Sequence, residues 1–488
     1  MSSSSLARIV KNSLYYFFST ITPSLLSYVY WFIVTKLVSP DVIGLASMAV
    51  SLSLIATSIA MIGIPASASR FMGFAYGRGE ARLLREFFHS GLTLTLFLAC
   101  LASMVAALTL HLASSETSLI VGLLVFATCL HRYYNSLFTS TERAKYTFYA
   151  NLAGSFTRLF IGVLLVLVGL GVVGVLLGYV SFSLACLTLY LVLSFRLLRG
   201  YSFSLARVKE LVKAGVAGWA PSIISTLGVY LGVLMVYGFK GASQTGLYFI
   251  AYLIATTIAS INTSLQAITL PTLSGMVDGR KLTSWRVLKL SLALIAPTSL
   301  TLMVYSKDLL SLLGPLYVEA WLILCILLVG TLMAPMISSL SVLLYAYGLY
   351  SLVTLLGLTI NLPRTLLYLT LTPIYGGLGA ALSYTIGSFI GLVAAIIIAR
   401  KVNFMYRWRI LGLTFIAPLP LSLLSTFIHL PWIIGAPLII TLSLLTYAKI
   451  GVVTREDLRD LAMGLLPERI MKLLAEKFRF LLNLLYSD

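Results

Sequence analysis

The chain has 488 residues, of which 59% are hydrophobic and only 10% are charged. Soluble domains carry about 25% charged residues, so this composition excludes an ordinary soluble fold and indicates a protein of the lipid bilayer. The formal net charge is +19, but the basic residues are spread over many short connections. A nucleic-acid-binding protein would gather them on one face, so that function is not expected.

Apolar windows of about 20 residues have the length that an α-helix needs to cross the hydrocarbon core. Fourteen such windows follow one another, and the sequence therefore predicts an all-α polytopic membrane protein with about 14 transmembrane helices. The approximate limits are 12–35, 43–66, 88–110, 117–138, 148–169, 173–195, 214–238, 246–270, 287–305, 320–344, 350–372, 377–399, 410–428 and 431–448.

The basic residues orient these predicted spans. If the first span starts inside, 29 of the 34 Lys and Arg lie at the N-terminus, in the even-numbered connections or in the C-terminal tail. The positive-inside bias then places both termini in the cytoplasm of a multi-pass protein of the cell membrane. The same charges are expected to attract anionic membrane lipids.

An internal repeat divides the chain. Residues Leu54–Ala60 return almost unchanged as Leu253–Ala259, and Pro23 in the first span has a counterpart in Pro221. Two repeats with even numbers of spans have the same orientation, which predicts two pseudo-symmetric six-helix lobes. The expected boundaries are 1–200 for the N-lobe with spans 1–6, 201–402 for the C-lobe with spans 7–12, 403–450 for spans 13–14, and 451–488 for a cytoplasmic tail.

Two arginines lie near the middle of equivalent spans, Arg158 in the fifth and Arg364 in the eleventh. A mid-membrane charge costs about 2.5–3.5 kcal/mol on insertion scales, so it persists mainly at a wet cavity or beside a partner. Asn151 and Ser155 share a helical face with Arg158, and Asn361 shares one with Arg364. We expect all five to bind substrate. The alternative is that the arginines are structural clamps neutralised by backbone carbonyls.

The charge of this predicted interior follows from what the spans lack. None of the 15 Asp and Glu residues falls inside a predicted span. Two guanidinium groups without an acidic partner would make the interior positive, and guanidinium binds phosphate and carboxylate through paired hydrogen bonds. The expected ligand is therefore an anion.

Proline and amide residues interrupt several spans. Pro23, Pro221 and Pro363 remove backbone donors inside predicted helices, so each is a candidate hinge, although proline in membrane helices is often purely structural. Asn262 and Gln266 share one face of the eighth span. They are expected to bond either to sugars or to a neighbouring helix.

The tail has an apolar stripe between Ile470 and Leu485 with charged residues mostly off it. This pattern predicts an amphipathic helix that lies at the membrane interface or docks a partner. The four cysteines all lie in apolar runs without ligand-like spacing and are predicted to be core residues, with no metal site.

Several motifs resemble one known family. The run Val34–Pro40, the pair Gly44-Leu45, and Gly63–Pro65 leading to Arg70 are similar to the polysaccharide-biosynthesis (Wzx-like) flippases of the MOP superfamily. The resemblance implies two six-helix lobes that face each other around a central cavity, with Arg70 at the cavity entrance, and two additional C-terminal helices. It also implies alternating access.

The function expected from the residues and the resemblance is transport, without a cofactor. The substrate would be a polyprenyl-(pyro)phosphate-linked oligosaccharide moved from the inner to the outer leaflet, with glycan-assembly enzymes as partners. The alternatives are a MATE-like multidrug exporter, which typically uses buried acids that these spans lack, and a non-transporting membrane scaffold. An enzyme is not expected, because the histidines are scattered and no phosphate-binding glycine loop is present.

Overall fold

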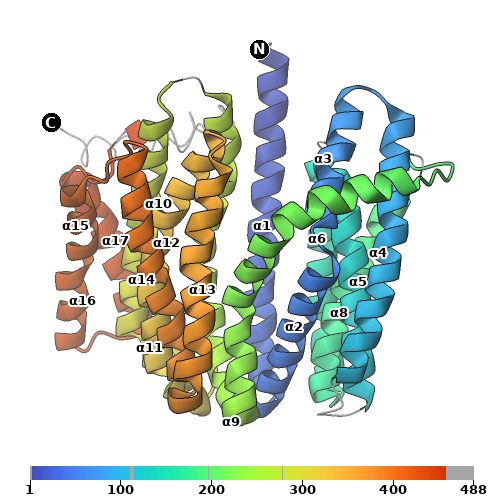
Figure 1. The fold of residues 1–488 in the computed structure, drawn as a ribbon. Coiled ribbons are helices and arrows are strands. Elements are labelled where there is room, and N and C mark those ends of the chain that lie inside the picture. Colours follow the sequence, from blue (N-terminus) through green and yellow to red (C-terminus); the bar gives the residue numbers. More distant parts are fainter. Residues whose placement is uncertain are drawn as a thin grey trace. The chain divides into compact units, whose positions relative to one another are not determined.

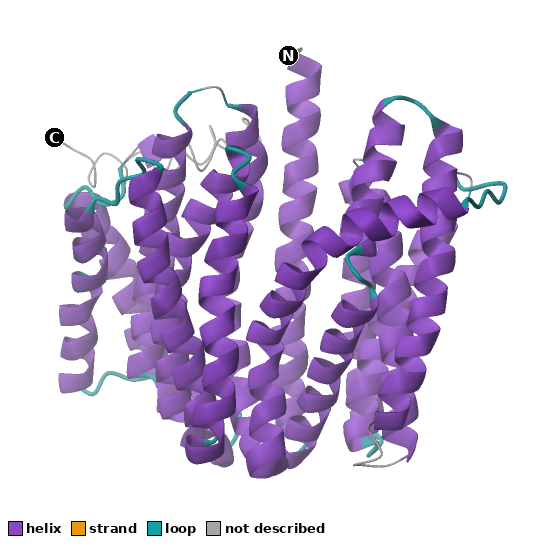
Figure 2. Ribbon diagram, viewed as in Figure 1, coloured by secondary structure: helices purple, strands orange, loops and turns teal. Residues whose placement is uncertain are grey.

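The computed structural model describes residues 3–109, 115–141, 143–195, 197–276, 278–454 and 456–457. All regular structure in this part of the chain is helical, as Figure 2 shows. The elements, labelled in Figure 1, are α1 (Ser3–Leu37), α2 (Pro40–Ala60), α3 (Ile64–Gly77), α4 (Ala81–Thr109), α5 (Ser115–Ser140), α6 (Ala144–Thr157), η1 (Arg158–Gly162), α7 (Val163–Leu167), α8 (Gly171–Ser194), α9 (Leu205–Gly275), α10 (Arg280–Val304), α11 (Ser306–Ser311), η2 (Pro315–Ala320), α12 (Trp321–Ala346), α13 (Tyr350–Tyr375), α14 (Gly377–Lys401), α15 (Trp408–Ile416), α16 (Pro418–Phe427) and α17 (Trp432–Lys449).

These helices confirm the predicted membrane architecture. By length and composition, 12 helical segments among the described residues are suited to cross a bilayer. One of them, Gly218–Ser274, has 57 residues and would be about 85 Å long as a single helix, far more than the ~30 Å of hydrocarbon. The backbone of Gly241 leaves the helical region there (φ 79°, ψ −174°), so α9 contains both the seventh and the eighth predicted span. The first predicted span coincides with α1.

The chain divides into two compact units. The N-terminal unit contains residues 18–250 and 361–383; the C-terminal unit contains chiefly residues 251–360 and those from 384 onward. Helices α1, α9, α13 and α14 contribute to both units. The lobe boundaries expected from the internal repeat remain a prediction.

Glycine permits close helix contacts in the N-terminal unit. A Cβ atom on Gly178 of α8 would lie 2.9 Å from the Cα atom of Gly162 at the end of η1. A Cβ atom on Gly246 of α9 would lie 2.1 Å from the carbonyl oxygen of Pro40, where α2 begins. No side chain fits at either point, and the backbones therefore approach directly.

Polar contacts join helices inside the C-terminal unit. Asn262 donates a hydrogen bond to the Ser338 hydroxyl at 2.9 Å, and Gln266 donates one to the Ser339 hydroxyl at 2.9 Å. Both amides thus link α9 to α12. Of the two expectations for these residues, the helix-to-helix bond is the one that the geometry supports.

The start of the tail is attached to the same unit. Asp457 forms an ion pair with Lys289 of α10, and both side chains are buried. The Asp457 carboxylate also accepts hydrogen bonds from the backbone NH (2.8 Å) and the hydroxyl (2.7 Å) of Thr454, and the Asp457 backbone NH donates to the Thr454 hydroxyl at 3.3 Å. This is the reciprocal arrangement of a helix-capping box. The predicted amphipathic helix further along the tail lies outside the described residues.

Candidate cationic binding site

Arg158 begins a short π-helical turn, η1, within the helical segment that runs from α6 to α7. Such turns are rare and are frequent at functional sites. Glycine allows close packing on both sides of the turn. A Cβ atom on Gly154 would lie 2.6 Å from the Cys186 sulfur, and one on Gly162 would lie 2.8 Å from the Tyr30 ring. The turn therefore presents Arg158 between two points where α8 and α1 pack closely against the segment.

Three aromatic rings surround the Arg158 guanidinium. Its central carbon lies 5.6 Å from the ring centroid of Tyr30, 5.1 Å from that of Tyr179 and 5.4 Å from that of Phe182. Tyr179 is fixed in turn, because its hydroxyl accepts a 2.9 Å hydrogen bond from the Trp31 indole. Cation–π contacts of this kind contribute about 0.5–2 kcal/mol each. They offset part of the cost of a buried charge without neutralising it.

Few of the hydrogen-bond donors of Arg158 are used by the protein. The side chain is only 6% exposed, and it donates a 3.5 Å hydrogen bond from Nη2 to the Pro23 carbonyl. Among the described residues its buried Nε has no hydrogen-bond partner. Because a guanidinium has five N–H donors, most of them are available for a ligand.

Those donors border a cavity of about 150 Å³. The lining combines Arg158 with polar groups from three helices: Ser53 of α2, Thr128 and Arg132 of α5, and Tyr179 of α8. None of the ion pairs in the described part of the chain includes Arg158 or Arg132. The cavity thus has two cationic groups and hydroxyl donors, a combination that favours an anion.

The sequence reasoning missed Arg132 and its neighbour His131, which also lines the cavity. Arg132 lies in the C-terminal part of α5, near the predicted cytoplasmic end of the span. Its position along the chain therefore groups it with the basic residues that orient the spans. The sequence did carry a signal, because Arg132 lies within the predicted span 117–138 and not after it. A charge there has to face a polar space rather than lipid.

Ser155 lies about one turn and Asn151 about two turns before Arg158 on the same helical segment, and both side chains bond to protein groups. Asn151 donates a 3.3 Å hydrogen bond to the Ser19 carbonyl. That carbonyl lies four residues before Pro23, which has no N–H to bond it, so Asn151 supplies the missing donor. Ser155 is fully buried and bonds the Asn151 carbonyl of its own helix at 2.7 Å. Their role as substrate ligands remains a prediction.

Arg364 is held in a different arrangement on α13. Its Nη1 donates to the Gly228 carbonyl of α9 and to the Asn361 amide oxygen, each at 3.4 Å. The Tyr368 hydroxyl bonds the same Gly228 carbonyl at 3.2 Å. Arg364 is 6% exposed. These contacts of Arg364 lie on α9 and α13, whereas Arg158 bonds the Pro23 carbonyl of α1; a single site that contains both arginines remains a prediction.

The other predicted positions can be located but not assigned a role. Arg70 is exposed on α3, next to the Phe71 ring at 5.8 Å. Pro23 lies inside α1, Pro221 inside α9 and Pro363 inside α13. The cavity-entrance role of Arg70 and the hinge roles of the prolines remain predictions.

The sequence matches the family model of polysaccharide biosynthesis proteins over residues 9–277, more than half of the chain. No curated protein matches the sequence.

Solved transporters share the fold. The lipid II flippase MurJ, in an inward closed conformation, is 14% identical with a TM-score of 0.74 over 91% of this chain and 98% of that one. A MATE structure in complex with MaL6 is 15% identical with a TM-score of 0.59, over 81% and 95% of the two chains. A MOP superfamily transporter from Pyrococcus furiosus, whose binding pocket is described as having reverse polarity, is 14% identical with a TM-score of 0.58, over 81% and 96%. At these identities the likeness concerns the fold alone.

Proposed function

Because the chain belongs to the polysaccharide biosynthesis protein family, a family of the MOP transporter superfamily, we propose that it is a flippase for a polyprenyl-(pyro)phosphate-linked oligosaccharide. The substrate would move from the inner to the outer leaflet of the cell membrane by alternating access. Both termini would be cytoplasmic, and the chain would catalyse no covalent reaction.

The observation that carries the proposal is the cavity beside Arg158. Its guanidinium has unused donors, a second arginine lines the same space, and no carboxylate of the described residues pairs with either. Phosphate oxygens would accept charge-assisted hydrogen bonds from these donors, which are about twice as strong as neutral ones. The cavity therefore suits the anionic group that links the lipid to the glycan.

The volume limits what the cavity holds. At about 150 Å³ it is smaller than the ~300–1,000 Å³ of sites that enclose a drug-sized ligand. It accommodates a phosphate group, while the glycan and the lipid chain have to lie outside it. Arg364 would act as a second cation for the anionic group during transport. Its Nη1 atom donates to two protein oxygens.

Drug export is the alternative that this site disfavours. A cationic drug entering the cavity would meet Arg158 and Arg132 without a compensating acid among the described lining residues. Like charges at close range repel, and in a poorly solvated space the repulsion is stronger than in water.

The test is a transport assay in reconstituted vesicles with a fluorescent lipid-linked oligosaccharide on the inner leaflet. The parent protein should expose the label on the outer face, and the Arg158→Ala variant should do so far more slowly at equal reconstitution. Arg78→Ala is the matched control, because Arg78 is an exposed arginine that stacks on Phe74 at 4.0 Å outside the cavity. Parental rates in the Arg158 variant would refute the site. Export of a cationic dye without movement of the lipid would refute the function.

A further inference from the structure

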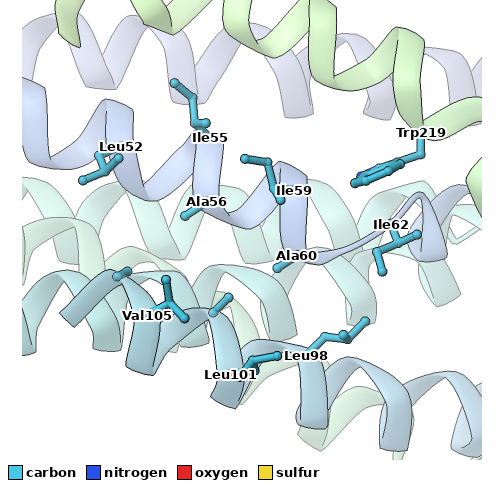
Figure 3. Close-up of a pocket in the computed structure, with 12 residues that line it drawn as sticks. Leu52, Ile55, Ala56, Ile59, Ala60, Ile62, Leu98, Leu101, Val105 and Trp219 are labelled. Carbon is cyan, nitrogen blue, oxygen red and sulfur yellow. The ribbon is translucent and has the colours of Figure 1, made fainter. Parts of the chain in front are cut away.

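A second cavity, of about 460 Å³, lies between α2, α4 and the first part of α9 in the N-terminal unit (Figure 3). Its lining is apolar, with Leu52, Ile55 and Ile59 from α2 and Leu98 and Val105 from α4. Trp219 of α9 projects toward the cavity at the end where Ile62 lies (Figure 3). The volume falls within the about 300–1,000 Å³ of sites that enclose small molecules.

The cavity opens toward the surroundings of the unit. Ile59 is 47% exposed and Val105 is 51% exposed, and both belong to helices suited to cross the bilayer. Apolar side chains at such positions are suited to contact with lipid rather than water. We therefore expect an apolar occupant that enters from the membrane.

Trp219, at one end of the cavity, is held by a hydrogen bond and by close backbone packing. The Trp219 indole donates a 3.2 Å hydrogen bond to the Ser58 carbonyl, one of the last carbonyls of α2, which has no partner within the helix. Just beyond, Ile62 has a φ of +44°, a costly conformation for a β-branched residue. A Cβ atom on Gly63 would lie 2.3 Å from the Gly215 carbonyl oxygen. The corner after α2 and the first part of α9 thus fit together closely and hold Trp219 in place.

The two cavities share α2. Val50, Ser53 and Leu54 line the cationic cavity, whereas Leu52, Ile55 and Ile59 line the apolar one. At about 3.6 residues per turn, these two sets fall on opposite faces of the helix. An anionic site and an apolar site are therefore separated by the width of one helix, a distance that is short compared with an amphipathic ligand that has an anionic head and a long chain.

We propose that the apolar cavity between α2, α4 and Trp219 binds the polyprenyl chain of the lipid-linked substrate while the phosphate occupies the cavity beside Arg158. This inference rests on the proposed function, because it takes the same ligand. A polyprenyl chain is long enough to pass around α2, and its methyl-branched units suit a wide cavity lined by branched side chains. The chain would then contribute to recognition rather than remain in bulk lipid.

The test uses a polyprenyl phosphate that carries a diazirine in its chain, bound to the full-length protein in nanodiscs of phospholipid. After illumination, mass spectrometry should locate the label on peptides of α2 and α4. Unlabelled polyprenyl phosphate in excess should suppress the labelling, whereas a phospholipid with a matched excess of acyl chain should not. Equal suppression by the phospholipid would show that the cavity holds bulk lipid and would overturn the inference.

Variants separate this inference from the proposed function. Ala102→Phe places a ring in the cavity and should lower labelling of α2 and α4 at least fivefold. Met104→Phe on the same helix is the control, since Met104 is 62% exposed and does not line the cavity; it should leave labelling unchanged. If the parent labels helices other than α2 and α4 while transport still depends on Arg158, the inference fails and the function stands. If neither binding nor transport depends on Arg158, the cationic site fails and this inference fails with it; if the parent moves no lipid-linked oligosaccharide, the proposed function fails.

Discussion

Replacing Arg158 by Met is the sharpest test of the cationic cavity. Methionine keeps an unbranched side chain that fills the space of the aliphatic part of arginine, and it removes every donor and the charge. Arg158 also contributes to the stability of the protein, because its guanidinium contacts three aromatic rings. The variant is informative only if the loss of binding can be separated from a loss of stability.

The expected magnitudes separate the two effects. Hydrogen bonds to charged groups contribute about 1.5–3 kcal/mol, which corresponds to roughly 10- to 150-fold in the dissociation constant for polyprenyl phosphate. On the stability side, the lost cation–π contacts, about 0.5–2 kcal/mol each, are offset by removal of a mid-membrane charge that costs about 2.5–3.5 kcal/mol. Affinity should therefore fall by one to two orders of magnitude with little change in the melting temperature.

The assay is the binding of fluorescent polyprenyl phosphate to the purified protein in nanodiscs, together with thermal unfolding of the same samples. Arg158→Lys should restore part of the affinity, because lysine keeps the charge but lacks the planar fork that engages two phosphate oxygens. Arg78→Met, which removes an exposed arginine from the Phe74 ring, should bind as the parent does. An Arg158→Met variant that binds within twofold of the parent would refute the reasoning and leave Arg158 a structural clamp.

The remaining predictions concern stability. Asp457→Ala should destabilise the C-terminal unit by about 3–5 kcal/mol, because it leaves Lys289 buried without its partner, and the double variant Asp457→Ala/Lys289→Met should recover much of that loss in thermal unfolding. Burial raises the pKa of Asp457, but the hydrogen bonds from Lys289 and Thr454 lower it by more, so the pKa lies below its usual 3.8. The stability that the ion pair contributes is therefore present above pH ~4. It should be lost as the pH falls through the lowered pKa of the folded state. Gly246→Ala should lower the melting temperature, because its Cβ atom would lie 2.1 Å from the Pro40 carbonyl oxygen and overpacking costs about 1–3 kcal/mol. Gly238→Ala, where nothing lies within 4 Å, should be neutral or stabilising, and equal melting temperatures for the two glycine variants would contradict the close contact.

The architecture could be read from the sequence because the bilayer imposes a simple length rule. A helix has to satisfy its own backbone groups over about 20 apolar residues, and this requirement appears directly in the pattern of composition. The break inside α9 was also predictable, since the two expected spans are separated by a polar stretch that contains Gly241. The division into two compact units was not predictable from the sequence, because it depends on which helices pack together and not on where each helix begins.

The candidate site was only partly predictable for a related physical reason. Spacing along a helix shows which residues share a face, and it singled out Arg158, which borders the cationic cavity; its role as a substrate ligand remains a prediction. It does not show whether a polar side chain is already bonded, and Ser155 proves to be bonded within its own helix, a common use of serine in membrane helices. The aromatic contacts of Arg158 come from Tyr30 and Phe182. These residues are distant in the sequence and only packing brings them together.

The way in which Arg158 is stabilised bears directly on what it can bind. A carboxylate partner would neutralise the guanidinium and occupy its donors, which would lower the affinity for an anion. Aromatic rings and a single backbone carbonyl stabilise the charge in another way, because they leave it uncompensated and leave most N–H groups free of protein acceptors. The cost of burying the charge is thus reduced without a loss of attraction for phosphate. On the proposed function, a site made this way would favour an anionic ligand that brings its own negative charge.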